Sequence, residues 1–189
     1  MARDQELLDC IVEAKQTFGK KCAKYAGACT VEALRAALDT AGLPTSARDV
    51  FIRAVPVEID LLIPRAEGIE VDKLVYDADD VLVALEVKNS GSFGESTLKN
   101  VRDCFQRIHE ASSNIECLYV TVAELRNYRW RATRENLQAE VYTLFWHNSA
   151  KRRKYEATGD WERLLAHIRD VVEKSRMTLP AKIQNGKGD

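Results

Sequence analysis

The sequence predicts an α/β domain in which a central mixed sheet is flanked by helices. Apolar residues recur at helical spacing near both ends of the chain, and alternating or β-branched runs fill much of the middle. These segments follow the order helix, several strands, helix, strand, strand, helix. With 189 residues, of which 46% are hydrophobic, the chain is long enough to bury a sizeable core.

Two helices are expected at the beginning of the chain. Residues 6–24 carry apolar side chains at close to helical spacing. A second helix is expected from Thr30 to Ala41, because Thr30 is a suitable N-cap and Gly42 is a typical residue for ending a helix.

Strand signals dominate the rest of the chain and are interrupted by further helices. The strands are expected over residues 50–54, 57–63, 74–76, 81–87, 115–122 and 140–146. A helix capped by Ser96 or Thr97 is expected to run to near Ala111, and residues 124–138 are expected to be helical in part. A last amphipathic helix is expected over residues 161–174.

The chain is expected to form a single domain over residues 1–178, with its core at about 31–146 and a C-terminal helix at about 160–174. Residues 179–189 are expected to form a loose tail. No apolar run approaches the roughly 20 residues of a membrane span. The N-terminus has no apolar signal core, so a cytoplasmic protein without membrane contact is expected.

Cysteine and histidine usage argues against a zinc site. The five cysteines form no Cys-x-x-Cys pair and only three histidines are present, so reduced thiols are expected. The net charge of −1 does not by itself demand a nucleic-acid partner. Basic residues gather locally at 151–154, and arginines alternate with Tyr128 and Trp130 over residues 126–134. These stretches either contact phosphates and bases or form solvated loops.

Charged side chains interrupt two of the predicted apolar strands. In an extended strand, alternate residues share a face, so Asp60 would share its side with Glu58 and Leu62, and Glu86 would share its side with Lys88. The apolar sides can enter the core while the charged sides converge. Two carboxylates bind a hard divalent cation through oxygen, and an adjacent ammonium can assist a metal-activated water or a phosphoryl oxygen. The combination suggests phosphodiester hydrolysis.

The predicted strand is what makes the Glu-x-Lys sequence at Glu86 a candidate site. Glu13-Ala-Lys15 also matches, but it lies in a predicted helix, where residues two apart do not face each other. The alternative interpretation of Glu86 and Lys88 is an exposed sheet face or edge on which charges discourage aggregation.

The layout resembles the PD-(D/E)xK, or restriction-endonuclease-like, nuclease superfamily. Ile59-Asp60 matches the first part of its motif and Glu86-Val87-Lys88 matches the second. Glu32, early in the helix before the strands, is similar in position to the helix Glu of the family. The resemblance covers about residues 31–146 and implies an αβββαβ core with a mixed sheet.

Two departures from the family pattern are present. No proline precedes Asp60. The long separation between Asp60 and Glu86 requires an extra hairpin or strand near residues 70–76, which leaves Glu70 or Asp72 as an alternative to Glu86.

The resemblance implies a role for each matching residue. Asp60 and Glu86 would ligate Mg²⁺ or Mn²⁺, with the carbonyl of Val87 as a third ligand. Lys88 would orient or help deprotonate the attacking water and stabilise the pentavalent phosphate. Glu32 could hold a second ion or an outer-shell water.

Two further polar residues are candidates for accessory roles. Glu58 is an alternative outer ligand, or else a surface charge. Gln106 lies on the helix after the motif, where some relatives place a polar residue that faces the site, or else it is a solvated helix position.

The favoured function is a divalent-metal-dependent endo- or exonuclease with DNA, rather than RNA, as its expected substrate. Restriction, repair, or defence against phages and mobile elements would be its setting, and a homodimer would supply more recognition surface. The first alternative is a catalytically inactive nuclease-like module that binds nucleic acid or protein. The second is an α/β domain that acts on a small molecule through Cys or His, although no nucleophile–base spacing supports it.

Overall fold

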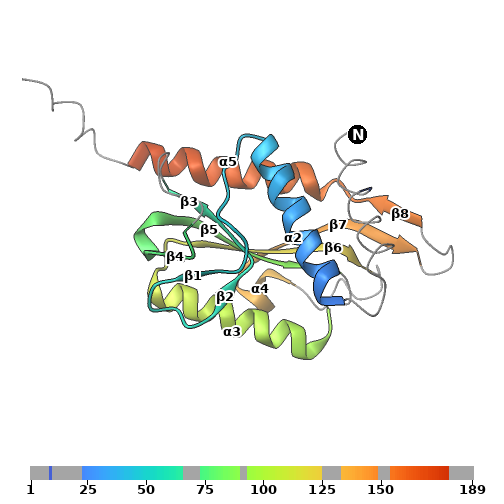
Figure 1. The fold of residues 1–189 in the computed structure, drawn as a ribbon, viewed down its shortest axis with the longest axis horizontal. Helices are drawn as coiled ribbons and strands as arrows, with labels where there is room; N and C mark the ends of the chain where they lie inside the picture. Colours follow the sequence, from blue (N-terminus) through green and yellow to red (C-terminus); the bar gives the residue numbers. More distant parts are fainter. Residues whose placement is uncertain are drawn as a thin grey trace, which may run out of the picture.

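The computed structural model describes residues 9, 23–65, 73–89, 93–124, 133–148 and 154–178. Most of the predicted helix over 6–24, the alternative acids Glu70 and Asp72, and the predicted tail lie outside these residues. The elements are α2 (Ala23–Thr40), β1 (Val50–Ile52), β2 (Glu58–Ile59), β3 (Leu61–Pro64), β4 (Val75–Tyr76), the 3-10 helix η2 (Ala78–Asp80), β5 (Val81–Lys88), α3 (Glu95–Ala111), β6 (Glu116–Glu124), α4 (Arg134–Leu137), β7 (Glu140–Asn148), β8 (Lys154–Ala157) and α5 (Asp160–Thr178) (Figure 1).

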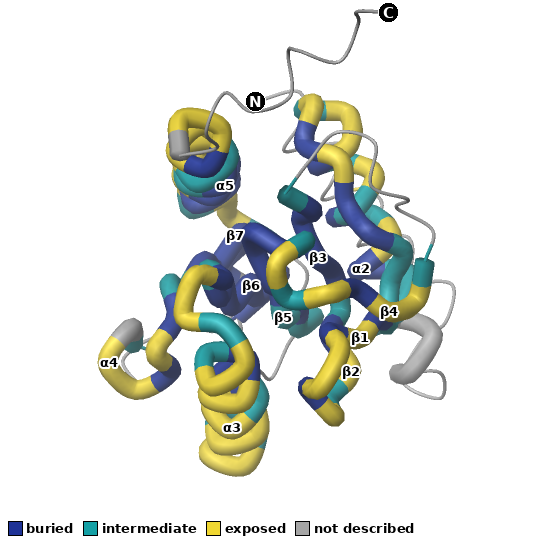
Figure 2. Tube along the Cα trace, turned by 90° about the vertical axis from the view of Figure 1, so that its left-hand side faces the viewer, coloured by how far each residue is buried: buried dark blue, intermediate teal, exposed yellow. Residues whose placement is uncertain are grey.

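A five-stranded mixed sheet in the order β3-β5-β6-β7-β8 forms the centre of the molecule. Its inner strands β5, β6 and β7 are parallel, and β3 and β8 join them antiparallel at the two edges. A smaller sheet has the order β2-β1-β4. Helices α3 and α5 lie on opposite sides of the central sheet, and the small sheet lies beside α3 (Figures 1 and 2). The predicted fold class, a mixed sheet flanked by helices, is confirmed.

Two apolar core layers pack against the two faces of the central sheet. One layer contains Leu34 of α2 and Leu164 of α5, together with Leu85 of β5. The other contains Phe105 of α3 and residues of the small sheet, together with Ala84 of β5. Because successive strand residues point to opposite faces, β5 contributes to both layers. The dark central strands in Figure 2 are buried from both sides.

Helix α2 starts earlier than predicted and ends where predicted. Thr30 is buried inside the helix, so its predicted N-cap role is wrong; the helix continues upstream to Ala23. At the other end Gly42 has a φ of +79°. The N–H of Gly42 donates to the carbonyl of Asp39, and the N–H of Leu43 donates to that of Leu38, each at 3.0 Å. This pair of bonds is a Schellman motif, which confirms Gly42 as the helix stop.

Other element boundaries also differ from the predictions. Helix α3 begins at Glu95 with Gly94 as its N-cap, so neither Ser96 nor Thr97 has the capping role. The short edge strand β8 was not predicted, because only its pairing with β7 distinguishes it from a loop. Within the described part of the chain, no helix combines the length and the apolar character needed to cross a membrane.

The predicted strand over 57–63 is two short strands that belong to different sheets. β2 pairs with β1 and β3 pairs with β5, and Asp60 lies in the bend between them. Ile59 therefore packs in the core layer beside α3, and Leu61 packs in the layer beside α2 and α5. A single strand over 57–63 would place these two residues together on its apolar side, and that prediction is wrong. Leu62, expected on the charged side, is fully buried next to Ile59.

Candidate active site

The bend at Asp60 meets the end of β5 on the α3 side of the central sheet. Strands β3 and β5 run antiparallel with Leu61 opposite Leu85, so Asp60, one step before β3, falls opposite Glu86. The N–H of Val87 donates a hydrogen bond of 2.7 Å to Oδ2 of Asp60. Strand pairing therefore closes the long sequence separation between the two acids.

Lys88 joins the two carboxylates into one cluster. Its Nζ donates a hydrogen bond to Oε1 of Glu86 and lies 3.7 Å from Oδ2 of Asp60. The side chains of Glu86 and Asp60 are only 15% and 20% exposed. With both acids ionised, the cluster formed by Asp60, Glu86 and Lys88 carries one more negative than positive charge.

Burial and mutual repulsion shift the ionisation of this cluster. Burial, with the charge of Asp60 adding to it, raises the pKa of Glu86 to about 7. Burial also raises the pKa of Asp60, and the ammonium of Lys88 offsets this only in part. Burial alone would lower the pKa of Lys88, but the neighbouring carboxylates outweigh it and raise that pKa. Lys88 is therefore an ammonium at neutral pH, and Glu86 is the group that titrates there.

The donor set of the cluster fits a hard divalent cation. When both are ionised, its two partly buried carboxylates exceed the single positive charge of Lys88, and a cation would balance the remaining negative charge. Among the described residues, no group of three or more His, Cys, Asp and Glu is arranged to hold a metal ion. Mg²⁺ does not need such a cage, because it is commonly bound by one or two carboxylates, waters and substrate phosphate oxygens. The ligand role of the Val87 carbonyl stays a prediction.

Glu32 lies apart from the cluster. Its carboxylate is 48% exposed and pairs with Arg35 at 3.4 Å and with Arg48 at 3.6 Å. Arg48 is in turn 3.4 Å from Oδ2 of Asp49. The N–H of Asp49 donates to the carbonyl of Asp60 at 3.2 Å, and the charge of Asp49 adds to the raised pKa of Asp60. Glu32 is thus linked to the cluster through two ion pairs of Arg48 and the backbone hydrogen bond of Asp49.

Asp49 is an acid near the cluster that sequence reasoning missed. It has a φ of 59°, a left-handed conformation that Asp tolerates better than most residues. Its position follows from the segment before β1, which runs along β3. Ser46 shows this pairing, since its N–H donates to the carbonyl of Leu62 and its hydroxyl accepts from the N–H of Leu62, each at 2.9 Å. Nothing local in the sequence signals this pairing.

The accessory candidates lie at the margin of the cluster. Glu58 is exposed, and its charge adds to the raised pKa of Glu86. Gln106 is also exposed, and its Nε2 donates to Oε1 of Glu110 at 2.9 Å rather than to the cluster. The residue of α3 beside the cluster is Cys104. Burial, with the charge of Glu86 adding to it, raises the pKa of its thiol to about 12.

The predicted basic stretches lie mainly outside the described residues. Residues 125–132 and 151–153 are among those the structure does not describe, so their predicted contacts with nucleic acid stay predictions.

Comparison with known proteins connects this fold to solved structures and not to a sequence family. No family model matches the chain, and no curated protein matches it. NucC of P. aeruginosa ATCC27853 in its cAAA-bound form has a TM-score of 0.61 at 10% sequence identity, covering 94% of this chain and 96% of that one. NucC of E. coli MS115-1 in its cAAA-bound form has a TM-score of 0.61 at 11% identity, covering 92% and 93%. The chain shares the NucC fold. The apo form of the E. coli protein gives a TM-score of 0.50 at 11% identity, covering 90% and 97%.

Proposed function

We propose that this chain is a divalent-metal-dependent nuclease of the PD-(D/E)xK superfamily that hydrolyses phosphodiester bonds in DNA. The observation that carries the proposal is the convergence of Asp60, Glu86 and Lys88, which come from a bend and a strand far apart in the sequence. A buried pair of carboxylates is costly to keep unless a cation balances it. One lysine does not balance two carboxylates, which supports a bound cation. The shared fold with NucC supports the architecture in which the motif is expected.

The residues of the cluster would have different chemical roles. Asp60 and Glu86 would hold Mg²⁺ or Mn²⁺, which supplies Lewis-acid polarisation of a phosphoryl oxygen and a more acidic water. Lys88 is already protonated, so it donates from Nζ to a phosphate oxygen and offsets the charge that develops on the pentavalent phosphate. This favours the predicted stabilising role of Lys88 over its predicted role in deprotonating water.

A cleavage assay on folded protein tests the proposal. Wild type is incubated with linear, circular and single-stranded DNA and with RNA, in Mg²⁺, Mn²⁺ or EDTA. Because both NucC proteins have cAAA-bound structures, each reaction is run with and without cAAA. We expect metal-dependent DNA cleavage that falls by about 100-fold or more in Asp60→Ala and Lys88→Ala. Lys99→Ala, an exposed lysine of α3, is the matched control and keeps wild-type activity.

The outcomes separate an enzyme from a binding module. Wild-type cleavage by folded Asp60→Ala and Lys88→Ala proteins would contradict the proposed site. DNA binding without cleavage, together with no Mg²⁺ or Mn²⁺ binding by calorimetry, would favour the inactive nuclease-like module. Sedimentation of the purified protein tests the expected homodimer.

A further inference from the structure

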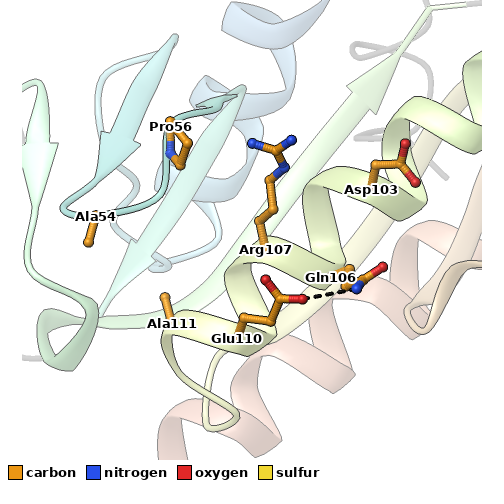
Figure 3. A pocket seen from close by; sticks show the side chains of 7 residues that line it. All are labelled: Ala54, Pro56, Asp103, Gln106, Arg107, Glu110 and Ala111. Atoms are coloured by element: carbon orange, nitrogen blue, oxygen red, sulfur yellow. Dashed lines mark hydrogen bonds between the residues drawn. The ribbon is translucent and has the colours of Figure 1, made fainter.

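A cavity of about 580 Å³ lies between α3 and the connection from β1 to β2. Ala54 and Pro56 line it on the side of the connection, and Gln106, Arg107 and Glu110 line it on the side of α3. Figure 3 shows the side chain of Arg107 extending towards Pro56, while Gln106 and Glu110 are bonded to each other. The guanidinium therefore faces the opening between the two walls.

The cavity lies near the cluster of Asp60, Glu86 and Lys88, although no member of the cluster lines it. Arg107 follows Cys104 by three positions on α3, so the two side chains lie on one side of the helix. Cys104 lies within electrostatic reach of Glu86 and Lys88 and also of Arg107. Arg107 is thus three residues, roughly 4.5 Å along α3, from the part of the helix beside the cluster.

Arg107 is available to a ligand. No described residue forms an ion pair or hydrogen bond with it, whereas Arg53, just after β1, is paired with Asp77 at 2.5 Å. An arginine presents a planar fork of donors that matches the oxygens of a phosphate. The walls also include the carboxylates of Asp103 and Glu110, so the cavity is not a basic track. Arg107 is the one cation among the described residues that line it, so the cavity offers a single phosphate contact.

We propose that Arg107 binds a backbone phosphate of the DNA strand next to the phosphate held at Lys88, and that the cavity takes the strand on that side. This inference rests on the proposed nuclease function and adds a substrate-binding residue to it. Gln106, which was a candidate either for facing the site or for a solvated helix position, bonds to Glu110 at the edge of this cavity.

Binding of a short labelled DNA in EDTA, measured over a range of salt concentrations, tests the role of Arg107 apart from catalysis. We expect Arg107→Ala to weaken binding about tenfold and to reduce the slope of log K against log salt by about 0.7 to 1, the share of one phosphate contact. Arg107→Lys should keep the slope and lose part of the affinity, because an ammonium has no fork. Arg102→Ala removes an exposed arginine of the same helix outside the cavity and should match wild type.

Kinetics with Mg²⁺ give the second measurement. Arg107→Ala should raise KM for DNA about tenfold with kcat largely kept, and its circular dichroism and melting temperature should match wild type. If wild type cleaves DNA but Arg107→Ala keeps the wild-type slope and KM, the cavity inference is wrong and the proposed function holds. If the slope depends on Arg107 but wild type does not cleave, the proposed function is wrong and the phosphate contact holds. Equal effects of Arg107→Ala and Arg102→Ala would also contradict the inference.

Discussion

The negative charge of Glu86 is costly in the candidate active site. In the absence of a bound cation its pKa is raised from 4.5 to about 7, first by burial and then by Asp60. The folded protein therefore keeps a proton that the unfolded chain releases between these pH values. The free energy of unfolding from this group consequently falls as pH rises through that window, and the lost stability is fully felt above about pH 7.

Replacing Glu86 by Gln should remove this cost. In EDTA at pH 8 we expect Glu86→Gln to raise the free energy of unfolding by about 1 to 3 kcal/mol, and the melting temperature with it. At pH 5 we expect both quantities to change little. Lys88 keeps Asp60 as its partner in the variant, so no ammonium is left unpaired. Thermal unfolding of both proteins at both pH values measures the difference. A variant less stable than wild type at pH 8 would show that the pair with Lys88 outweighs burial.

The residues in and near the cluster differ in whether their positions could be predicted from the sequence. Glu86 and Lys88 share a face because a strand alternates with period two, which is a local property. The nearness of Asp60 depends on which strands pair, so alternation made the convergence plausible and the family resemblance supported it. Asp49 and Arg107 could not be anticipated, because an irregular segment and a cavity wall bring them near the cluster. Glu32 matched the family pattern in position but is engaged by Arg48.

At the scale of elements, the break between β2 and β3 decides where Asp60 lies. A continuous strand would have kept Asp60 in register within one sheet, whereas the bend lets its carboxylate accept from the N–H of Val87. The alternating sequence over 57–63 cannot reveal the break, since both halves have the same periodicity. Only their partners, β1 and β5, distinguish them.

Gly27 inside α2 and Gly42 just after its end provide predictions with opposite signs. Gly42 has a φ of +79° at the end of the helix, and Gly27 lies inside it with nothing within 4 Å of the position of an added Cβ. Gly42→Ala should therefore lower the free energy of unfolding by about 1 kcal/mol, because alanine is strained at positive φ. Gly27→Ala should raise it by about 0.5 to 1 kcal/mol, because alanine is the better helix former. Chemical denaturation measures both; a loss of stability in both variants would contradict this account of α2.

At the scale of the molecule, the central sheet separates two core layers, and the candidate active site belongs to only one of them. The layer of α3 and the small sheet supports Asp60 and Glu86, and the layer of α2 and α5 packs against the opposite face. The order of helices and strands was predictable from local periodicity. The division into two sheets was not, because it depends on pairing between distant segments. The similarity to the NucC fold at 10% to 11% identity likewise shows that very different sequences can form this fold.

This separation predicts that a substitution in the layer of α5 affects stability alone, whereas one in the layer of α3 also affects activity. Leu164 of α5 is fully buried on the face away from the site, so Leu164→Ala should cost about 2 to 5 kcal/mol through the cavity it leaves. Below its lowered melting temperature, kcat and KM for DNA should stay at wild-type values. Phe105 of α3 is fully buried in the core layer on the side of the candidate active site, where Cys104 also packs. Phe105→Leu should cost only about 1 to 2 kcal/mol, yet reduce kcat by about tenfold or more, because small shifts of catalytic groups are expensive. Cleavage rates and melting temperatures of both variants give the comparison. If kcat instead followed the loss of stability in both, the two layers would be mechanically coupled through the sheet.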